Sequence, residues 1–441
     1  MKKTAPFETL LHKIESRKAR VGIVGLGYVG LPLALEFARA GFRVVGVDVD
    51  ARKVAALKKG DSYIEDVTPE ELGEALASGR LQVSSKYGAF KGADTISITV
   101  PTPLRKSKEP DVSFIQAAVE ALVPVLRPPA LVVLESTTYP GTTRELVEAR
   151  LGRKGFEPGK NLFVAFSPER IDPGNPSWKT RNIPKVVGGT SPAGTRLAAA
   201  LYGQAVETVV EVGSSEEAEM VKLLENTFRA VNIALVNELM LMCDRMGINV
   251  WNVVDAAATK PFGFTPFYPG PGIGGHCIPL DPMYLAWRAR AYDYTNRFIE
   301  LATDINGNMP RFVVNKAARI LNRRRRKALA GAKVLLLGMA YKAGVSDTRE
   351  SPAVEVLKLL ETEKAKVSYS DPHVPALSKG QVGRAIRSRP LTRALLRGSD
   401  LVVLLASHPE FDKKLIARHS PLILDTRNAL VGMAGSNIER L

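Results

Sequence analysis

The sequence predicts an α/β protein in which two doubly wound parallel-sheet domains are joined by a long central helix. Three observations predict this fold. Apolar strand-like runs alternate with helical patterns in the first half of the chain, a single long helical pattern follows, and a second alternating series closes the chain. With 441 residues, the chain is also longer than one hydrophobic core usually serves, so two or three domains are expected.

The first domain is predicted from the order strand, glycine turn, helix, strand near the N-terminus. Residues 21–24 are mainly apolar and end at the turn GLGYVG, residues 25–30. A helical pattern covers residues 31–41, and a second apolar run over residues 42–47 ends at Asp48. This order is that of a Rossmann-like dinucleotide-binding unit. Further strand-like runs extend the predicted sheet, at residues 95–100, 131–134 and 162–166.

Each conspicuous residue of the turn has a physical reason. Gly25 allows the tight turn, Gly27 lets the backbone approach a pyrophosphate, and Gly30 permits close packing of the helix on the strand. Asp48 would accept hydrogen bonds from ribose hydroxyls and repel a 2′-phosphate, which favours NAD over NADP. The alternative is a turn that binds nothing. Lys53 could reach the adenosine end of the cofactor or simply lie in solvent.

The middle of the chain predicts one long helix. Ser214 and Ser215 precede Glu216 and Glu217, a pattern typical of an N-cap followed by acids that complement the helix dipole. Apolar residues then recur at helical spacing until Gly247. A helix of this length is expected to connect two domains or to build a subunit interface.

A second, smaller α/β domain is predicted after the basic run RRRRK at residues 323–327. Residues 333–337 form an apolar strand, and residues 352–360 a helix with a proline in its first turn. More strands are expected at residues 366–369, 401–405 and 422–424.

Composition excludes several classes of protein. The chain is 45% hydrophobic, which excludes a mainly disordered protein. It contains no apolar run of about 18 to 20 residues, no apolar segment in its charged N-terminal region, and two cysteines, so we expect a cytoplasmic protein without a membrane span. The net charge of +16 attracts anions, but interleaved aromatic residues and a known nucleic-acid module are missing. Small anionic substrates are consistent with this charge, and we expect no nucleic-acid partner.

The segment PGPGIGGHCIPLDP, residues 269–282, is the most informative stretch. Its four glycines and four prolines predict a constrained loop and exclude a regular helix or central strand. Gly274 and Gly275 would let Cys277 approach a ligand closely, and Asp281 lies four residues further on. These neighbours favour chemistry at Cys277.

Two further residues, Cys243 and His276, are given no catalytic role. A buried cysteine is often a small inert apolar residue, which suits Cys243 on an apolar stretch of the long helix. His276 adjoins the reactive cysteine, but sequential neighbours often point in different directions, so it is given no role.

Polar residues on the helix and at two strand ends are further candidates. Lys222 and Asn226 are four residues apart and share one helix face, where they could stabilise an oxyanion or form an ordinary polar surface. Glu169 in FSPERIDPGN follows a predicted strand, at the edge where α/β sheets bind ligands. The turn ESTTYPG, residues 135–141, ends another strand, and both turns could equally serve only to shape loops.

These motifs together resemble the nucleotide-diphosphate-sugar 6-dehydrogenases, the UDP-glucose dehydrogenase group. The resemblance covers nearly the whole chain, through GLGYVGLPLA, VPTP, ESTTYPG, FSPER, KLLENTFRAVNIALVNE, GGHCIPLDP, GMAYKAGVSDTRESP and DTRN. The cysteine segment preceded by FGFTPFYP looks most like members that act on UDP-N-acetylhexosamines, above all UDP-N-acetylglucosamine. The resemblance implies an NAD-binding domain at residues 1–212, a central dimerisation and catalytic-loop domain at 213–327, and a UDP-binding Rossmann-like domain at 328–441.

The resemblance also implies the reaction. In this family a primary alcohol becomes a carboxylate through two NAD-dependent oxidations in one site. Cys277 would be the nucleophile that forms a thiohemiacetal and then a thioester. Lys222 and Asn226 would stabilise the oxyanions, Asp281 and Thr137 would hold the hydrolytic water, and Glu169 would act as a general base.

Contacts to cofactor and substrate follow by the same resemblance. The implied cofactor contacts are Gly25, Gly27, Tyr28, Val29, Gly30, Asp48, Lys53, Val100, Pro101, Thr102, Thr137 and Arg349. The implied substrate contacts are Glu169, Arg170, Lys222, Asn226, Tyr268, Gly272, Gly274, Lys342 and Arg427. No metal is implied. The partners expected are a UDP-sugar and at least one further copy of the chain.

One position departs from the family pattern, and other functions stay open. UDP-glucose members commonly carry a second glutamate where this chain has Pro173, and Asp172 is one residue short of that position. The alternative substrates are UDP-glucose and UDP-N-acetylmannosamine. A single-step hydroxyacid dehydrogenase or a non-catalytic basic nucleotide-binding protein would also fit parts of the pattern.

Overall fold

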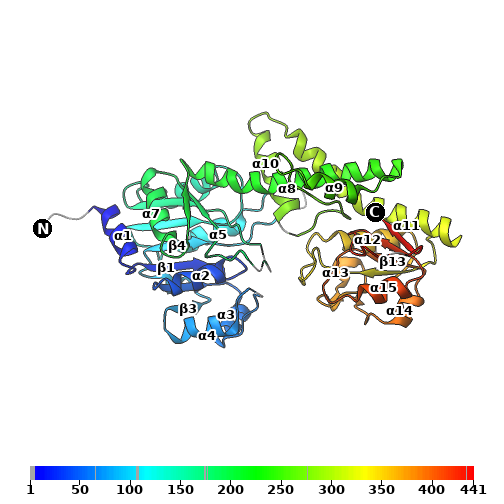
Figure 1. Cartoon of the computed structure of the whole chain (residues 1–441). Helices are drawn as coiled ribbons and strands as arrows, with labels where there is room; N and C mark the ends of the chain where they lie inside the picture. Colours follow the sequence, from blue (N-terminus) through cyan, green and yellow to red (C-terminus); the bar gives the residue numbers. More distant parts are fainter. Residues whose placement is uncertain are drawn as a thin grey trace. The chain divides into compact units, whose positions relative to one another are not determined.

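The computed structural model describes residues 5–64, 66–105, 109–172, 175, 177–275, 277–433 and 435–441. The chain divides into two compact units, each of them α/β (Figure 1). The first comprises Met1–Glu225 and Met283–Asp293, and the second Asn226–Pro282 and Tyr294–Leu441. The predicted fold class is confirmed, whereas the predicted three-domain boundaries stay a prediction.

An eight-stranded sheet forms the centre of the first unit. Its strands are β1 (Arg20–Val24), β2 (Arg43–Val47), β3 (Leu81–Ser84), β4 (Thr95–Ile98), β5 (Ala130–Leu134), β6 (Leu162–Phe166), β7 (Lys185–Gly189) and β8 (Val209–Glu211). The order is β3-β2-β1-β4-β5-β6-β7-β8, and only the β6–β7 pair is antiparallel. Ligands of such sheets bind where the strand order reverses, which here is between β1 and β4.

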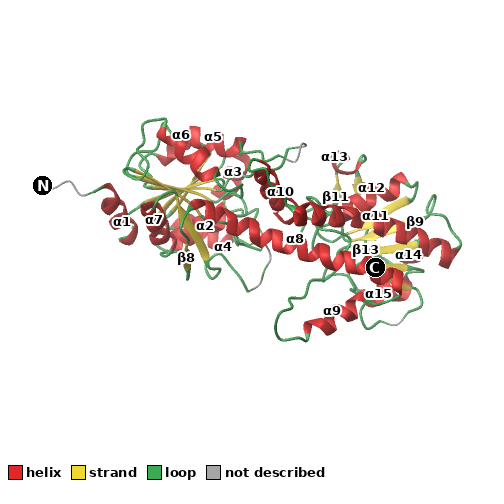
Figure 2. Cartoon of the chain, turned by 90° about the horizontal axis from the view of Figure 1, so that it is seen from above, coloured by secondary structure: helices red, strands yellow, loops and turns green. Residues whose placement is uncertain are grey.

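Helices cover both faces of this sheet (Figure 2). They are α1 (Pro6–Glu15), α2 (Gly30–Arg39), α3 (Ala51–Lys58), α4 (Pro69–Ala77), η1 (Tyr87–Phe90), α5 (Ser113–Leu122), η2 (Thr143–Glu148), α6 (Ala149–Gly152) and α7 (Pro192–Tyr202). Helices α1, α2 and α7 share one core, in which Phe37 and Leu201 are fully buried. Helices α5 and α6 share the core on the opposite face, with Ile115 and Leu151.

The second unit is built on a five-stranded parallel sheet. Its strands are β9 (Lys333–Leu337), β10 (Lys366–Ser370), β13 (Leu401–Leu404), β14 (Ile423–Asp425) and β15 (Ile438–Arg440), beside a short hairpin of β11 (Ala376–Leu377) and β12 (Ile386–Arg387). The order β10-β9-β13-β14-β15 is the second common doubly wound order, with its switch point between β9 and β13.

The remaining helices include two that the two units share. The helices are α8 (Ser215–Met246), α9 (Val250–Ala258), α10 (Cys277–Arg290), α11 (Arg297–Arg325), α12 (Pro352–Thr362), α13 (Lys379–Val382), α14 (Arg393–Arg397) and α15 (Lys413–His419). Helix α8 is the long helix that the sequence predicts. Cys243 on α8 is buried in a core with residues of α11 and β9, in line with its interpretation as a small apolar residue. Among the described residues, none of the helices combines the length and the hydropathy that a membrane span requires.

The prediction that residues 269–282 contain no regular helix is wrong at their C-terminal end. Helix α10 begins at Cys277 and contains two prolines. Pro279 lies in the first turn, where an N–H group has no acceptor within the helix, so its absence costs nothing. Pro282 removes a single hydrogen bond from a helix that continues to Arg290.

The basic run of residues 323–327 lies at a helix end. It contributes the last turn of α11, and Arg326 then adopts a left-handed conformation with φ +50°. Arg323 lies 3.1 Å from Glu439, and Lys327 lies 2.5 Å from Asp400. Acidic groups of the same unit thus neutralise part of this charge.

Candidate functional site

The glycine turn between β1 and α2 has the geometry that the sequence predicts. Gly25 has φ +92°, which favours glycine. A Cβ atom on Gly30 would overlap the Gly25 carbonyl oxygen, whereas a Cβ on Gly27 would meet nothing within 4 Å. The turn is therefore closed on its inner side and open at Gly27, where a ligand could approach the backbone.

Asp48 closes the turn from the end of β2. Its Oδ2 accepts a hydrogen bond from the Leu26 N–H at 3.0 Å, and its Oδ1 accepts one from the Asp50 N–H at 2.9 Å. Each oxygen of a carboxylate can accept a further hydrogen bond, so Asp48 keeps capacity for a ribose. Lys53 lies 3.7 Å from Asp48 Oδ2, and Tyr28 is 44% exposed beside the turn. These residues fit a bound NAD.

The loops after β4 and β5 contain four further residues that were predicted to contact the cofactor: Val100, Pro101, Thr102 and Thr137. The Ser136 hydroxyl donates to the Val100 carbonyl at 2.7 Å, which ties the two loops together. Thr102 is buried and accepts from the Tyr284 hydroxyl through its carbonyl, whereas Pro101 is exposed. Thr137 and Val29 are half-buried.

Glu169 and Lys222 meet in the first unit. The Lys222 ammonium, on α8, donates to the main-chain carbonyl of Glu169. Glu169 Oε1 accepts from the Ile171 N–H at 2.5 Å, and its Oε2 faces Lys185 Nζ at 3.7 Å. Both predicted residues therefore belong to one polar cluster at the edge of the sheet.

Arg170 is turned away from this cluster. Its guanidinium donates to the Pro184 carbonyl at 2.7 Å and pairs with Glu225 at 2.7 Å. Through these contacts Arg170 connects the Glu169 loop to the residues before β7 and to helix α8.

Asn226 and Asp281 meet in the second unit. The Asn226 amide donates to Asp281 Oδ2 at 2.5 Å, and both side chains are at most 5% exposed. Cys277 is the first residue of α10 and is exposed, and Asp281 is one helical turn further along. His276 and Pro173 lie outside the described residues.

The glycine-rich segment before α10 packs against the C-terminal sheet domain. The Gly275 N–H donates to the Arg349 carbonyl at 3.0 Å. Gly272 has φ +127°, and a Cβ on Gly274 would lie 2.7 Å from the Cβ of Tyr341. The segment can take this path only because these positions lack side chains.

The predicted substrate cations lie in the same unit. A Cβ on Gly270 would come within 2.7 Å of a guanidinium nitrogen of Arg427, so the segment also touches that residue. Burial lowers the pKa of Arg427 to about 10, which leaves it charged at neutral pH. Lys342 is half-buried, and Arg349 is exposed and pairs with Asp347 at 2.7 Å. Tyr268 is 46% exposed and donates to Asp255 at 2.8 Å.

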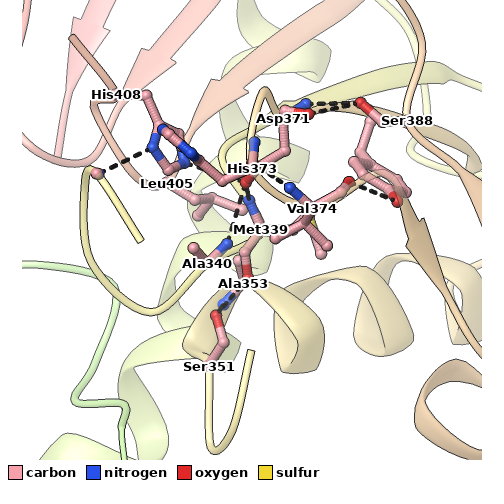
Figure 3. Close-up of polar contacts among 12 residues, drawn as sticks. Met339, Ala340, Ser351, Ala353, Asp371, His373, Val374, Ser388, Leu405 and His408 are labelled. Atoms are coloured by element: carbon pink, nitrogen blue, oxygen red, sulfur yellow. Dashed lines mark hydrogen bonds and ion pairs between the residues drawn. The ribbon is translucent and has the colours of Figure 1, made fainter. Parts of the chain in front are cut away.

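The second sheet has its own glycine turn and acid, but this acid is fully engaged (Figure 3). Asp371, at the end of β10, accepts from the N–H groups of Met339 at 2.5 Å and Ala340 at 3.1 Å through Oδ2. Its Oδ1 accepts from the N–H groups of His373 and Val374. Asp371 therefore lacks the spare capacity that Asp48 keeps for a ribose.

His408 completes this cluster. Its Nδ1 accepts from the Gly344 N–H at 3.1 Å, so its Nε2 carries the proton and donates to Asp371 Oδ2 at 3.1 Å. His373, His408 and Glu410 lie close enough for a cation, but both His408 nitrogens are already hydrogen bonded. Burial raises the pKa of Asp371, but His408 and the backbone donors outweigh it and hold that pKa at about 2. The cluster stabilises the turn and offers no metal site.

A buried polar group that the sequence does not predict lies next to Glu169. Lys185 Nζ lies 2.5 Å from Glu135, whose other oxygen accepts from the Tyr202 hydroxyl at 2.5 Å. The available signal was a lysine at the start of the apolar run KVVGG. Its partners lie 50 residues before it and 17 after it, so the pattern of the sequence did not reveal the group.

Comparisons with known proteins agree with these observations. The chain matches three domains of the UDP-glucose/GDP-mannose dehydrogenase family: the NAD binding domain over residues 19–206, the central domain over 216–308 and the UDP binding domain over 335–432. It is 34% identical to a UDP-N-acetyl-D-mannosamine dehydrogenase from Methanococcus maripaludis, with 93% of each chain covered. It is 36% identical to a UDP-N-acetyl-D-glucosamine 6-dehydrogenase from Pseudomonas aeruginosa, over 81% of this chain and 83% of the relative. The solved structure of a UDP-D-ManNAc dehydrogenase from Pyrococcus horikoshii matches 96% of this chain and 98% of its own, with a TM-score of 0.87 and 32% identity.

Proposed function

Because the chain belongs to the UDP-glucose/GDP-mannose dehydrogenase family, an NAD-dependent oxidoreductase family, we propose that it oxidises the C6 alcohol of a UDP-N-acetylhexosamine to a carboxylate. The observation that carries the proposal is the start of α10, where Cys277 is exposed and Asn226 holds the buried Asp281 one turn away. A thiol beside an oriented carboxylate suits the capture of an aldehyde and the later hydrolysis of a thioester.

The first oxidation converts the alcohol to an aldehyde. The glycine turn and Asp48 would hold NAD, which would accept the hydride in both oxidations. The charge that develops on the C6 oxygen would be stabilised by the Lys222 ammonium and the Asn226 amide. Both side chains are at most 8% exposed, and a charge is stabilised more strongly where water is excluded.

The second oxidation needs Cys277. Its thiolate adds to the aldehyde carbon and gives a thiohemiacetal, whose C6 hydrogen then leaves as hydride to form a thioester. The helix N-terminus favours the anionic form of a thiol at this position. Covalent capture also keeps the reactive aldehyde bound.

Hydrolysis releases the acid. Asp281 and Thr137 would orient a water molecule, and Glu169 would accept its proton as the oxygen attacks the thioester carbonyl. The tetrahedral intermediate then expels the Cys277 thiolate. The nucleotide would bind through Lys342 and Arg427, because cationic side chains form charge-assisted hydrogen bonds with a pyrophosphate. The sugar would contact Tyr268, Gly272 and Gly274.

The N-acetyl sugar is supported by the relatives. Those described above are named for UDP-N-acetyl-D-mannosamine and UDP-N-acetyl-D-glucosamine. The wording of the cysteine segment favours UDP-N-acetylglucosamine, and the Pyrococcus horikoshii structure favours the manno epimer. These two sugars are the leading candidates.

We also propose that two copies associate through α8. Seven large apolar side chains of this helix are at least 39% exposed, and five of them recur at heptad-like spacing: Phe228, Leu235, Leu239, Met242 and Met246. An exposed apolar stripe of this kind is typical of an interface, and a second copy presents the same stripe.

The test compares kcat/KM for UDP-glucose, UDP-N-acetylglucosamine, UDP-N-acetylgalactosamine and UDP-N-acetylmannosamine. We expect an N-acetyl sugar to be preferred, with two NADH and one uronic acid formed per sugar. One NADH per sugar would indicate a single-step dehydrogenase. No turnover of any of the four would indicate a nucleotide-binding protein.

A further inference from the structure

A buried polar group lies directly behind the Glu169 loop. It consists of Lys185 at the start of β7, Glu135 after β5, and Tyr202 at the end of α7. Lys185 Nζ is 2.5 Å from Glu135 Oε2 and 3.7 Å from Glu169 Oε2. The side chains of Lys185, Glu135 and Glu169 are 7%, 0% and 14% exposed.

The hydrogen bonds of this group fix its geometry. The Tyr202 hydroxyl donates to Glu135 Oε1 at 2.5 Å and can accept from the Ser97 hydroxyl at 3.3 Å. The ammonium of Lys185 lies 5.2 Å from the centre of the Tyr202 ring. Burial by itself lowers the pKa of Lys185, but Glu135 and Glu169 outweigh it and leave that pKa raised, so the side chain is an ammonium.

The group contains one ammonium and two carboxylates. Lys185 and Glu135 would suffice as a neutral buried pair, and such a pair alone is weak evidence of a stabilising role. Glu169 adds a second carboxylate to the same ammonium. The other polar contacts of Glu169 are the Ile171 N–H on its carboxylate and the Lys222 ammonium on its carbonyl. Arg170 points to Glu225 instead.

We propose that Lys185 is a positioning residue that holds the Glu169 carboxylate in place for the hydrolysis of the thioester. This inference rests on the proposed function, in which Glu169 accepts the proton of the attacking water. Glu135 and Tyr202 fix the position of Lys185, so the group acts as a rigid support beneath the base. Lys185 itself touches neither substrate nor cofactor in this scheme.

Two variants of the full-length enzyme give opposite expectations. Lys185→Met leaves Glu135 and Glu169 facing each other without a cation, so one of them binds a proton more readily. The acidic limb of the kcat–pH profile should then move to higher pH, and kcat should fall about tenfold to a hundredfold with little change in KM. Glu135→Gln removes one of the two carboxylates that face Lys185, so Glu169 becomes the charged partner of this ammonium. The acidic limb of the kcat–pH profile should then move to lower pH.

Rapid kinetics identify the affected step. Both oxidations precede hydrolysis, so Lys185→Met should form a rapid burst of two NADH per site followed by a slow steady rate. Intact-mass measurement should detect the acyl adduct on Cys277. Lys185→Arg should restore most of the rate. Lys160→Met, which removes an exposed lysine beside Glu157, is the matched control and should change none of these readouts.

The proposal is overturned if the acidic limb stays in place in both variants, or if Lys185→Met shows neither the burst nor the adduct. If Lys185→Met does not fold, the direction of the shift in Glu135→Gln decides alone. Failure of the proposed function is a separate result, because the wild-type enzyme would then form no uronic acid or a single NADH per sugar.

Discussion

At the scale of single residues, Cys277 and Asp281 show how a short helix organises chemistry. A residue four positions later on a helix lies on the same face, so the start of α10 places the carboxylate on the side of the thiol. Asn226 then holds that carboxylate by a hydrogen bond of 2.5 Å.

Replacing the nucleophile should abolish net oxidation. We expect Cys277→Ala to lower uronic acid formation on the order of a thousandfold or more, the scale seen when an enzyme loses its nucleophile. NAD affinity and the melting temperature should persist because the side chain is exposed. Acid formation measured by chromatography checks this, with Cys243→Ala as the control that keeps activity. Unchanged acid formation in Cys277→Ala would exclude covalent catalysis.

Asp48 should govern the choice of cofactor. Asp48→Asn replaces a charged acceptor by a neutral one, and hydrogen bonds to charged groups contribute about 1.5–3 kcal/mol. The KM for NAD should therefore rise about tenfold to a hundredfold, and discrimination against NADP should fall. Steady-state kinetics with both cofactors provide the measurement. Asp50→Asn, which alters the cap of α3 and the exposed ion pair with Arg52, should leave the KM for NAD unchanged.

At the scale of elements, two glycines of the turn between β1 and α2 should affect different properties, one the binding of NAD and the other the stability of the fold. Gly27→Ala has free space and should change the free energy of unfolding by less than about 0.5 kcal/mol, yet it should weaken NAD binding. Gly30→Ala would overlap the Gly25 carbonyl and should destabilise the fold by about 1–3 kcal/mol. Denaturant unfolding and NAD titration test the pair. Equal effects of the two changes on stability would contradict this geometry.

Helix α8 contributes a buried acid to the turn after β5. Glu219 accepts from the Gly141 N–H at 2.6 Å and from the Thr143 N–H at 2.8 Å. Burial raises the pKa of Glu219 to about 7 even though these donors oppose the shift.

The raised pKa predicts a pH-dependent stability. Because the folded pKa exceeds the unfolded value of 4.5, this contribution is fully present below pH 4.5 and is lost as the pH rises through about 7. The loss amounts to about 3 kcal/mol at 1.36 kcal/mol for each pH unit. Urea unfolding of the wild type and of Glu219→Gln at pH 5 and pH 8 provides the check. The same pH dependence in both proteins would rule out Glu219 as the cause.

Elements with a local signal could be predicted from the sequence, and elements held by distant partners could not. Strands such as β6 and β9 and helix α8 follow from apolar periodicity, and the glycine turn from its neighbours. Strands β7 and β8 were not predicted because they join an edge of the sheet beyond an antiparallel step, and β8 has only three residues. The start of α10 escaped because two prolines suggested a loop, although one of them lies in the first turn.

The candidate site shows the same division. The glycines, Asp48, Cys277 and Asp281 stand in compact motifs that carry their own context. Lys185 and Asp371 gain their surroundings from residues that are distant in the chain, such as Glu135 and His408. Only the folded chain reveals that one lysine faces two carboxylates.

At the scale of the whole molecule, the proposed dimer depends on the apolar stripe of α8. Leu235→Glu combined with Leu239→Glu places two like charges on that stripe, and we expect a monomer because a charge buried without a partner is costly. Sedimentation of the variant and the wild type measures this. Replacing the exposed Arg153 by Glu is the control and should leave the wild-type mass. A wild type that sediments as a monomer would refute the proposal.

The saturated carboxylate of Asp371 sets a limit on stoichiometry. Two Rossmann-like sheets suggest two binding sites for an adenine dinucleotide. In the second sheet, however, the carboxylate of Asp371 already accepts hydrogen bonds from backbone N–H groups and from the His408 imidazole, so it has no capacity left for a ribose. Equilibrium dialysis should accordingly saturate at a single equivalent of dinucleotide per polypeptide, however high its concentration is raised.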